Sequence, residues 1–189
     1  MSEQAALDML ESAWKARRRA FDLPDDEQGA ALAAVREEME RAAGSLRGTE
    51  ARDHYARALH LGAHVAMDLG DLDAAEEGWR EAVEVLRSTG EPLQLAHTIR
   101  HLGDLEMARG NLGEAARHYS EALALHREHS DQRSLDYANV VRRVAILAEK
   151  RAEMVEARAR WLEARETYAE LGVAEGVSEA DERLKAMER

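Results

Sequence analysis

Three segments of the sequence align with one another without gaps. They are DLDAAEEGWREAV, NLGEAARHYSEAL and EMVEARARWLEAR, which begin at Asp71, Asn111 and Glu153, 40 and 42 residues apart. A period of this length, sustained over three copies, is typical of stacked supersecondary repeats in which each unit covers the apolar face of its neighbour. The sequence therefore predicts a repeat array rather than a domain of unrelated elements.

Each repeat has the pattern of a helix, a tight turn and a second helix. In the middle copy, apolar residues at helical spacing run from Ile99 to Leu105 and precede Gly110. Asn111 follows this glycine and is a good helix N-cap, as is Asp71 one unit earlier. Only two prolines occur, and Ala, Leu, Glu and Arg dominate, a composition that favours helix. We therefore expect an all-α protein.

A small residue is followed four positions later by an aromatic one in every copy. The pairs are Ala75 and Trp79, Ala115 and Tyr119, and Ala157 and Trp161. Alanine lets two helices approach closely, and the aromatic ring fills the space beside the neighbouring helix. We therefore predict that these aromatic residues are packing residues.

The internal pattern resembles the tetratricopeptide repeat. The residues that carry the resemblance are Leu102, Gly103, Gly110, Ala115, Tyr119 and Ala122. The third copy is weaker, because Ala152 stands where the turn glycine belongs. The period resembles the longer-helix variety of kinesin light chains and bacterial Rap-type regulators. The resemblance implies a right-handed superhelical solenoid of antiparallel helix pairs.

The rest of the chain is predicted to flank these repeats. A helical pair before them is either a degenerate repeat or a cap, and a polar helix from Glu179 to Met187 closes the array. The predicted divisions are residues 1–48 for the N-terminal pair, 49–172 for the repeats (50–90, 91–131 and 132–172) and 173–189 for the C-terminal cap.

Composition and charge argue against several classes of function. The formal net charge of −12 is unfavourable for binding the phosphates of nucleic acids or an anionic membrane surface. No segment has the apolar length of a membrane span, and the N-terminus lacks the pattern of a secretory signal. The absence of cysteine excludes disulfides and thiolate metal sites. We expect a cytoplasmic protein.

The resemblance implies that the first helix of each pair lines a concave groove in which ligands bind. The polar residues expected there are Arg57, His60, His64, His97, Arg100, His101, Asp104, Asn139, Arg142 and Arg143. This set is basic and rich in histidine within an acidic chain, which favours a protein or peptide partner with carboxylates. Since no catalytic motif or cofactor fingerprint is present, we predict a non-enzymatic interaction module without a cofactor.

Two alternatives remain open. His60 with His64, and His97 with His101, have the i, i+4 spacing that can chelate Zn²⁺. However, no HExxH motif occurs, and Arg100 lies between the second pair, so we predict no metal at this site. The other alternative is a structural protein that forms a homodimer and has no separate peptide ligand.

Overall fold

The computed structural model describes residues 3–129 and 134–188 of the chain. Over these residues the chain forms nine helices and no strand. The helices are α1 (Glu3–Ala20), α2 (Asp25–Leu46), α3 (Arg52–Asp68), α4 (Leu72–Leu86), α5 (Pro92–Arg109), α6 (Leu112–His129), α7 (Leu135–Lys150), α8 (Met154–Glu170) and α9 (Ala174–Ala186). The prediction of an all-α protein built from helix pairs is confirmed.

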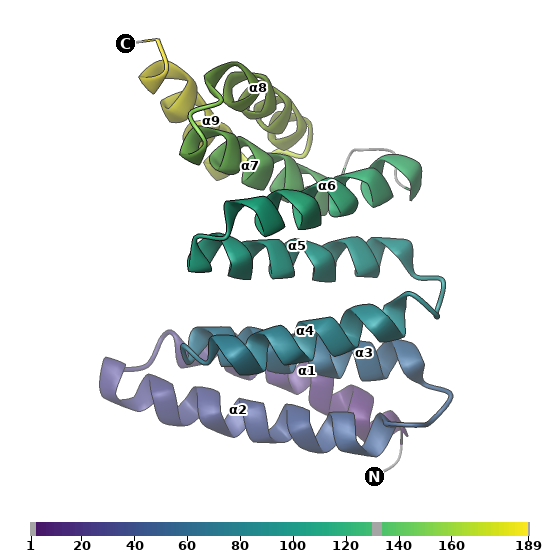
Figure 1. Ribbon diagram of the computed structural model, residues 1–189. Coiled ribbons are helices and arrows are strands. Elements are labelled where there is room, and N and C mark those ends of the chain that lie inside the picture. Colours follow the sequence, from purple (N-terminus) through teal and green to yellow (C-terminus); the bar gives the residue numbers. More distant parts are fainter. Residues whose placement is uncertain (1–2, 130–133, 189) are drawn as a thin grey trace. The chain divides into compact units, whose positions relative to one another are not determined.

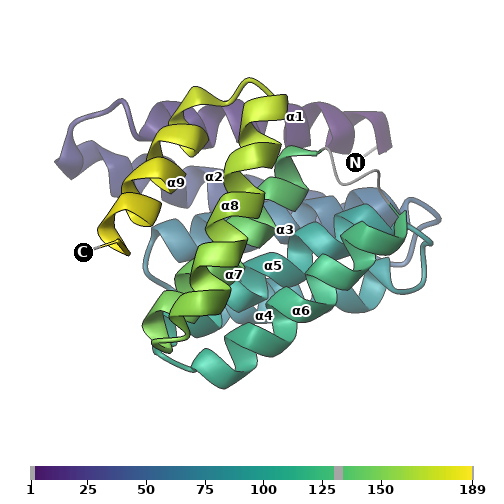
Figure 2. The same ribbon diagram turned by 90° about the horizontal axis from the view of Figure 1, so that it is seen from above.

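The helices fall into two compact units, Met1–Glu91 and Pro92–Arg189. In the first unit, each of the helices α1 to α4 packs against the next, and α1 also contacts α3 (Figure 1). In the second unit, α5 to α9 pack in the same consecutive way, and α5 also contacts α7 (Figure 2). Within each unit, therefore, the first helices of successive pairs are neighbours.

The turns inside the three recognisable repeats share one backbone conformation. Gly70 and Gly110 have φ angles of 78° and 82°, and Ala152 adopts the same left-handed region with φ of 57°. After Ala152, the Glu153 amide donates to the Ala148 carbonyl at 2.9 Å, which closes the end of α7 in a Schellman motif. Alanine thus occupies a conformation that glycine adopts without steric cost.

The predicted packing residues are buried. Each of the following has 1 % or less of its surface exposed: Ala75, Trp79, Ala115, Tyr119, Ala157 and Trp161. The glycine of the Leu-Gly pair, Gly103, is required by close packing, because a Cβ added there would lie 2.5 Å from Cε1 of Tyr119. The glycine lets the aromatic ring lie directly on the backbone of α5. The predicted role of these aromatic residues is confirmed.

Two local predictions have different outcomes. The Asp71 side chain accepts a hydrogen bond from the Ala74 amide at 3.1 Å, so it caps α4 as expected. The predicted start of the last helix at Glu179 is wrong, because α9 begins at Ala174. Gly176 lies against the Tyr168 ring, where a Cβ would be only 2.5 Å from Cγ of the ring. This contact packs the first turns of α9 onto α8, so the helix begins earlier than expected.

Candidate functional site

The predicted groove residues of the first unit all lie on α3, and most of them pack. Arg57 is exposed, His64 is half-buried and His60 is buried. The His64 ring lies edge-on to two indoles, with centroid distances of 5.6 Å to Trp14 and 5.4 Å to Trp79. On this helix, Arg57 is therefore the one predicted cation that is fully presented to solvent.

The C-terminal end of the same face is closed by α1. The Arg17 guanidinium donates two hydrogen bonds to the Asp68 carboxylate, at 2.5 and 2.9 Å. Both side chains are less than one fifth exposed. Because a bidentate, partly buried pair holds both partners in fixed geometry, α1 is firmly attached to α3 at this point.

The second unit brings its predicted residues together around one carboxylate. Asp104 on α5 accepts from the Arg100 guanidinium at 2.9 Å and from the Tyr119 hydroxyl at 2.8 Å. Arg143 on α7 forms an ion pair with the same carboxylate at 3.0 Å, and His101 lies 3.4 Å from it. Asp104 thus links α5, α6 and α7.

Arg100 is the most deeply buried of these cations, with 6 % of its surface exposed. Burial lowers the pKa of its guanidinium, and the neighbouring Asp104 opposes that shift. Its Nη2 also lies 2.6 Å from Nε2 of His101. A buried charge needs such partners, because removing it from water is costly. Arg100 therefore supports the network from within and does not itself face solvent.

The remaining predicted residues pair at the edges of this network. His97 Nδ1 lies 3.0 Å from Asp136, and this hydrogen bond lowers the pKa of the Asp136 carboxyl. Arg142 donates to Glu179 of α9 at 2.5 and 2.7 Å, which raises the pKa of the guanidinium and lowers that of the carboxyl. Asn139 accepts from the Tyr168 hydroxyl at 2.8 Å.

We call this surface the α5/α7 face and define it by seven residues: His97, Arg100, His101, Asp104, Asn139, Arg142 and Arg143. The side chains of His97, Arg142 and Arg143 remain 31, 27 and 35 % exposed. The face is therefore a set of arginine and histidine side chains already held in place by carboxylates, with the edges of three of them open to solvent.

Sequence reasoning missed two carboxylates that hold Arg142 and His97. Glu179 follows Asn139 by 40 residues, so continuing the repeat period by one unit would have placed it on the corresponding helix face. The Leu-Gly pair that marks the first helix of the middle repeat is absent from α9, which hid this register. Asp136 lies in the first turn of α7, where an acidic side chain is ordinary, and no sequence signal distinguishes it.

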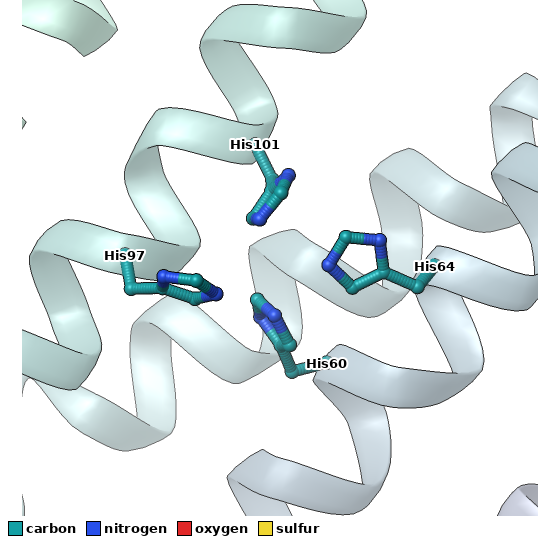
Figure 3. Close-up of side chains that lie close together, drawn as sticks. All are labelled: His60, His64, His97 and His101. Carbon is teal, nitrogen blue, oxygen red and sulfur yellow. The ribbon is translucent and has the colours of Figure 1, made fainter. Parts of the chain in front are cut away.

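The two histidine pairs have the geometry that their spacing predicts within each helix. Figure 3 shows the His60 and His64 rings side by side on α3, and the His97 and His101 rings side by side on α5. The ring centroids are 4.8 Å apart in the first pair and 4.9 Å apart in the second. In the α5 pair, the Arg100 guanidinium lies against His101 and disfavours a cation at that nitrogen.

Comparisons with known proteins identify the fold. No family model and no curated protein sequence matches the chain. BtubC (BKLC) from P. vanneervenii is similar over 97 % of this chain and 91 % of its own, with 18 % identity and a TM-score of 0.63. Aspartyl phosphate phosphatase F from Bacillus subtilis is 12 % identical over 95 % of this chain and 44 % of its own, with a TM-score of 0.73.

A third similar structure is a kinesin light chain protein from P. anserina with nearly identical TPR-like repeats. It is 12 % identical over 99 % of this chain and 96 % of its own, with a TM-score of 0.67. At these identities the likeness concerns the fold. Across residues 3–129 and 134–188, no helix is both long enough and apolar enough to span a membrane.

Proposed function

We propose that this chain, whose fold is that of the tetratricopeptide-like helical repeats, is a non-enzymatic protein-interaction module of the cytoplasm. Such folds generally mediate contacts between proteins, and curved repeat surfaces are common binding surfaces. The α5/α7 face would bind an acidic peptide or an acidic helix of a partner protein. The observation that carries this proposal is the convergence of Arg100, Arg143 and the Tyr119 hydroxyl on Asp104.

The convergence matters because it arranges the cations before a ligand arrives. Arg142 is held by Glu179, and Arg143 by Asp104, so neither side chain must give up much rotational freedom on binding. Ordering a long side chain at an interface costs roughly 0.5–1.5 kcal/mol, and prior ordering removes much of that cost. A guanidinium has five donors, so one already paired with a carboxylate can still donate to a second acceptor.

Ligand carboxylates would contact the open edges of Arg142, Arg143 and His97. Half-buried Met107 on α5 and Ile146 on α7 would add apolar contact. The charged contacts would favour acidic partners and speed association at low salt, since exposed charges are screened within about 8 Å at physiological ionic strength.

The arrangement supports a binding role rather than catalysis. The ionisable groups of the face lie beside carboxylates, as in structural ion-pair networks. The hydroxyl that reaches Asp104 is that of Tyr119, which donates to this carboxylate at 2.8 Å. Tyr119 is buried, and burial raises the pKa of its hydroxyl, so that group remains a neutral donor to Asp104.

The test is the binding of fluorescent acidic, neutral and basic peptides at low and high salt. We expect the parent protein to prefer acidic peptides and Arg143→Glu to weaken their binding about tenfold or more, as loss of a charge-assisted contact predicts. Arg41→Glu makes the same charge change at an exposed position of α2 and serves as the matched control. Equal weakening by both variants, or no preference for acidic peptides, would contradict the proposal.

A further inference from the structure

The outer surface of α8 carries an exposed apolar stripe. Val155 is 89 % exposed and Leu162 is 42 % exposed, and Ala159 lies exposed between them on the same side of the helix. The opposite side of α8 packs through buried Ala157, Trp161 and Ala164. Since that opposite side already supplies the packing of the repeat, the exposed stripe makes no contribution to the core.

The repeat alignment shows that the fold does not require apolar residues at these positions. The corresponding residues are Asp73, Glu77 and Arg80 on α4, and Gly113, Arg117 and Ser120 on α6. Two helices with the same place in the repeat thus carry charged, small or polar residues where α8 carries Val155, Ala159 and Leu162. An apolar surface of this kind on one unit is typical of a contact with another protein.

Two charges lie at equal spacing on either side of Leu162 in the sequence. Arg158 lies four residues before Leu162, and Glu166 lies four residues after it. Both side chains are exposed, and neither forms an ion pair or a hydrogen bond with any residue in the described ranges. The nearby Arg165 differs, because it is paired with Asp181 of α9 at 2.5 Å. Arg158 and Glu166 are therefore available to an external partner.

We propose that this surface, Val155, Arg158, Ala159, Leu162 and Glu166, binds the same surface of a second copy of the chain in antiparallel orientation. A two-fold axis at Leu162 would bring each Arg158 opposite the partner's Glu166, which is the self-complementarity that an isologous contact requires. Rows of residues four apart run alongside one another when helices cross at about −50°, the commonest packing class. The row from Arg158 through Leu162 to Glu166 fits that geometry.

The contact is a weak one. A single helix face from each copy buries less than the roughly 1,200 Å² of total surface at the lower limit of standard interfaces. The dimer should therefore form progressively between micromolar and millimolar protein, opposed by the net charge of −12 on each copy. The proposal concerns the outer side of α8 and is independent of peptide binding by the α5/α7 face.

The first test is sedimentation velocity over that concentration range. We expect the mass of the parent protein to rise towards that of a dimer. The double variant Val155→Asp, Leu162→Arg carries the residue types that α4 has at these positions, and it should stay monomeric. Unchanged helical circular dichroism would show that the variant is folded. Ser120→Arg places the same charge at the matching site of α6 and should dimerise like the parent. A parent that is monomeric throughout, or a double variant that still dimerises, overturns the proposal.

The second test exchanges the charges. Arg158→Glu and Glu166→Arg should each weaken dimerisation about tenfold, since two attractive pairs become two repulsive ones, each contributing modestly at an exposed site. Combining both substitutions in one chain should restore the parent affinity, because opposite charges then face each other again across the same antiparallel contact. Failure of the double exchange to recover dimerisation would exclude the antiparallel arrangement.

Discussion

Replacing Ala152 by glycine tests the backbone reasoning of the fold. Ala152 has φ of 57° at the position where the other two repeats place Gly70 and Gly110. It is exposed, so its methyl group contributes little packing that the substitution would lose. The variant Ala152→Gly should therefore change stability almost only through the backbone, and it should stabilise the protein.

The magnitude follows from two opposing terms. The left-handed conformation costs an L-residue roughly 1–2 kcal/mol relative to the right-handed one. Glycine loses more freedom on folding, and this costs about 0.4–1 kcal/mol. The expected net gain is about 0.5–1 kcal/mol in the free energy of unfolding. For a chain of this size it corresponds to a rise in melting temperature of about 1–4 °C.

Thermal unfolding followed by circular dichroism measures this change, and hydrogen exchange of the α7 and α8 amides shows whether it is local. Gly110→Ala is the matched control: no atom lies within 4 Å of the Cβ it would add, so only the φ of 82° opposes the alanine. That variant should lose about what Ala152→Gly gains. A neutral or destabilising Ala152→Gly beside a destabilising Gly110→Ala would refute the assignment of strain to residue 152.

Three further predictions concern the second unit. Gly103→Ala should destabilise it by about 1–3 kcal/mol in urea titration, because the new methyl group would overlap the Tyr119 ring. His126→Leu should reduce the pH dependence of stability. Burial lowers the pKa of His126 below 6.5, so its neutral ring favours the folded state above that pH and this contribution is lost on acidification; the variant should lose less stability than the parent as the pH falls from 6.5. Asp104→Asn should cost about 3 kcal/mol or more, since buried Arg100 loses its carboxylate, and a loss below ~1 kcal/mol would contradict the network.

The repeat architecture was predictable because its signals are local and recur. The geometry of one helix pair accounts for the helical spacing, the turn glycine and the Ala-aromatic pair. The constant spacing between copies then predicts that the pairs stack as repeats. The start of α9 was not predictable in this way. It depends on the contact between Gly176 and the Tyr168 ring, which joins α8 of the third repeat to α9, a helix without the pattern of the recognisable repeats.

The candidate site was predictable as a set of residues but not as a set of environments. The repeat register placed Arg100 and Arg143 on the first helices of adjacent pairs, where the structure has them. It gave no indication that Arg100 is buried, because burial depends on which neighbours cover a side chain. Nor did it pair Arg142 with Glu179, since α9 was outside the recognised repeats.

The most direct test of the proposed function is to locate a bound acidic peptide by NMR, observing the arginine Nε–Hε and backbone amide resonances during a titration. We predict that the resonances of Arg142 and Arg143 shift first and saturate together with the amides of α5 and α7, and that the Arg41 resonance on α2 does not move. Saturable shifts confined to α2, or to the outer face of α8, would contradict the assignment of the α5/α7 face as the binding surface.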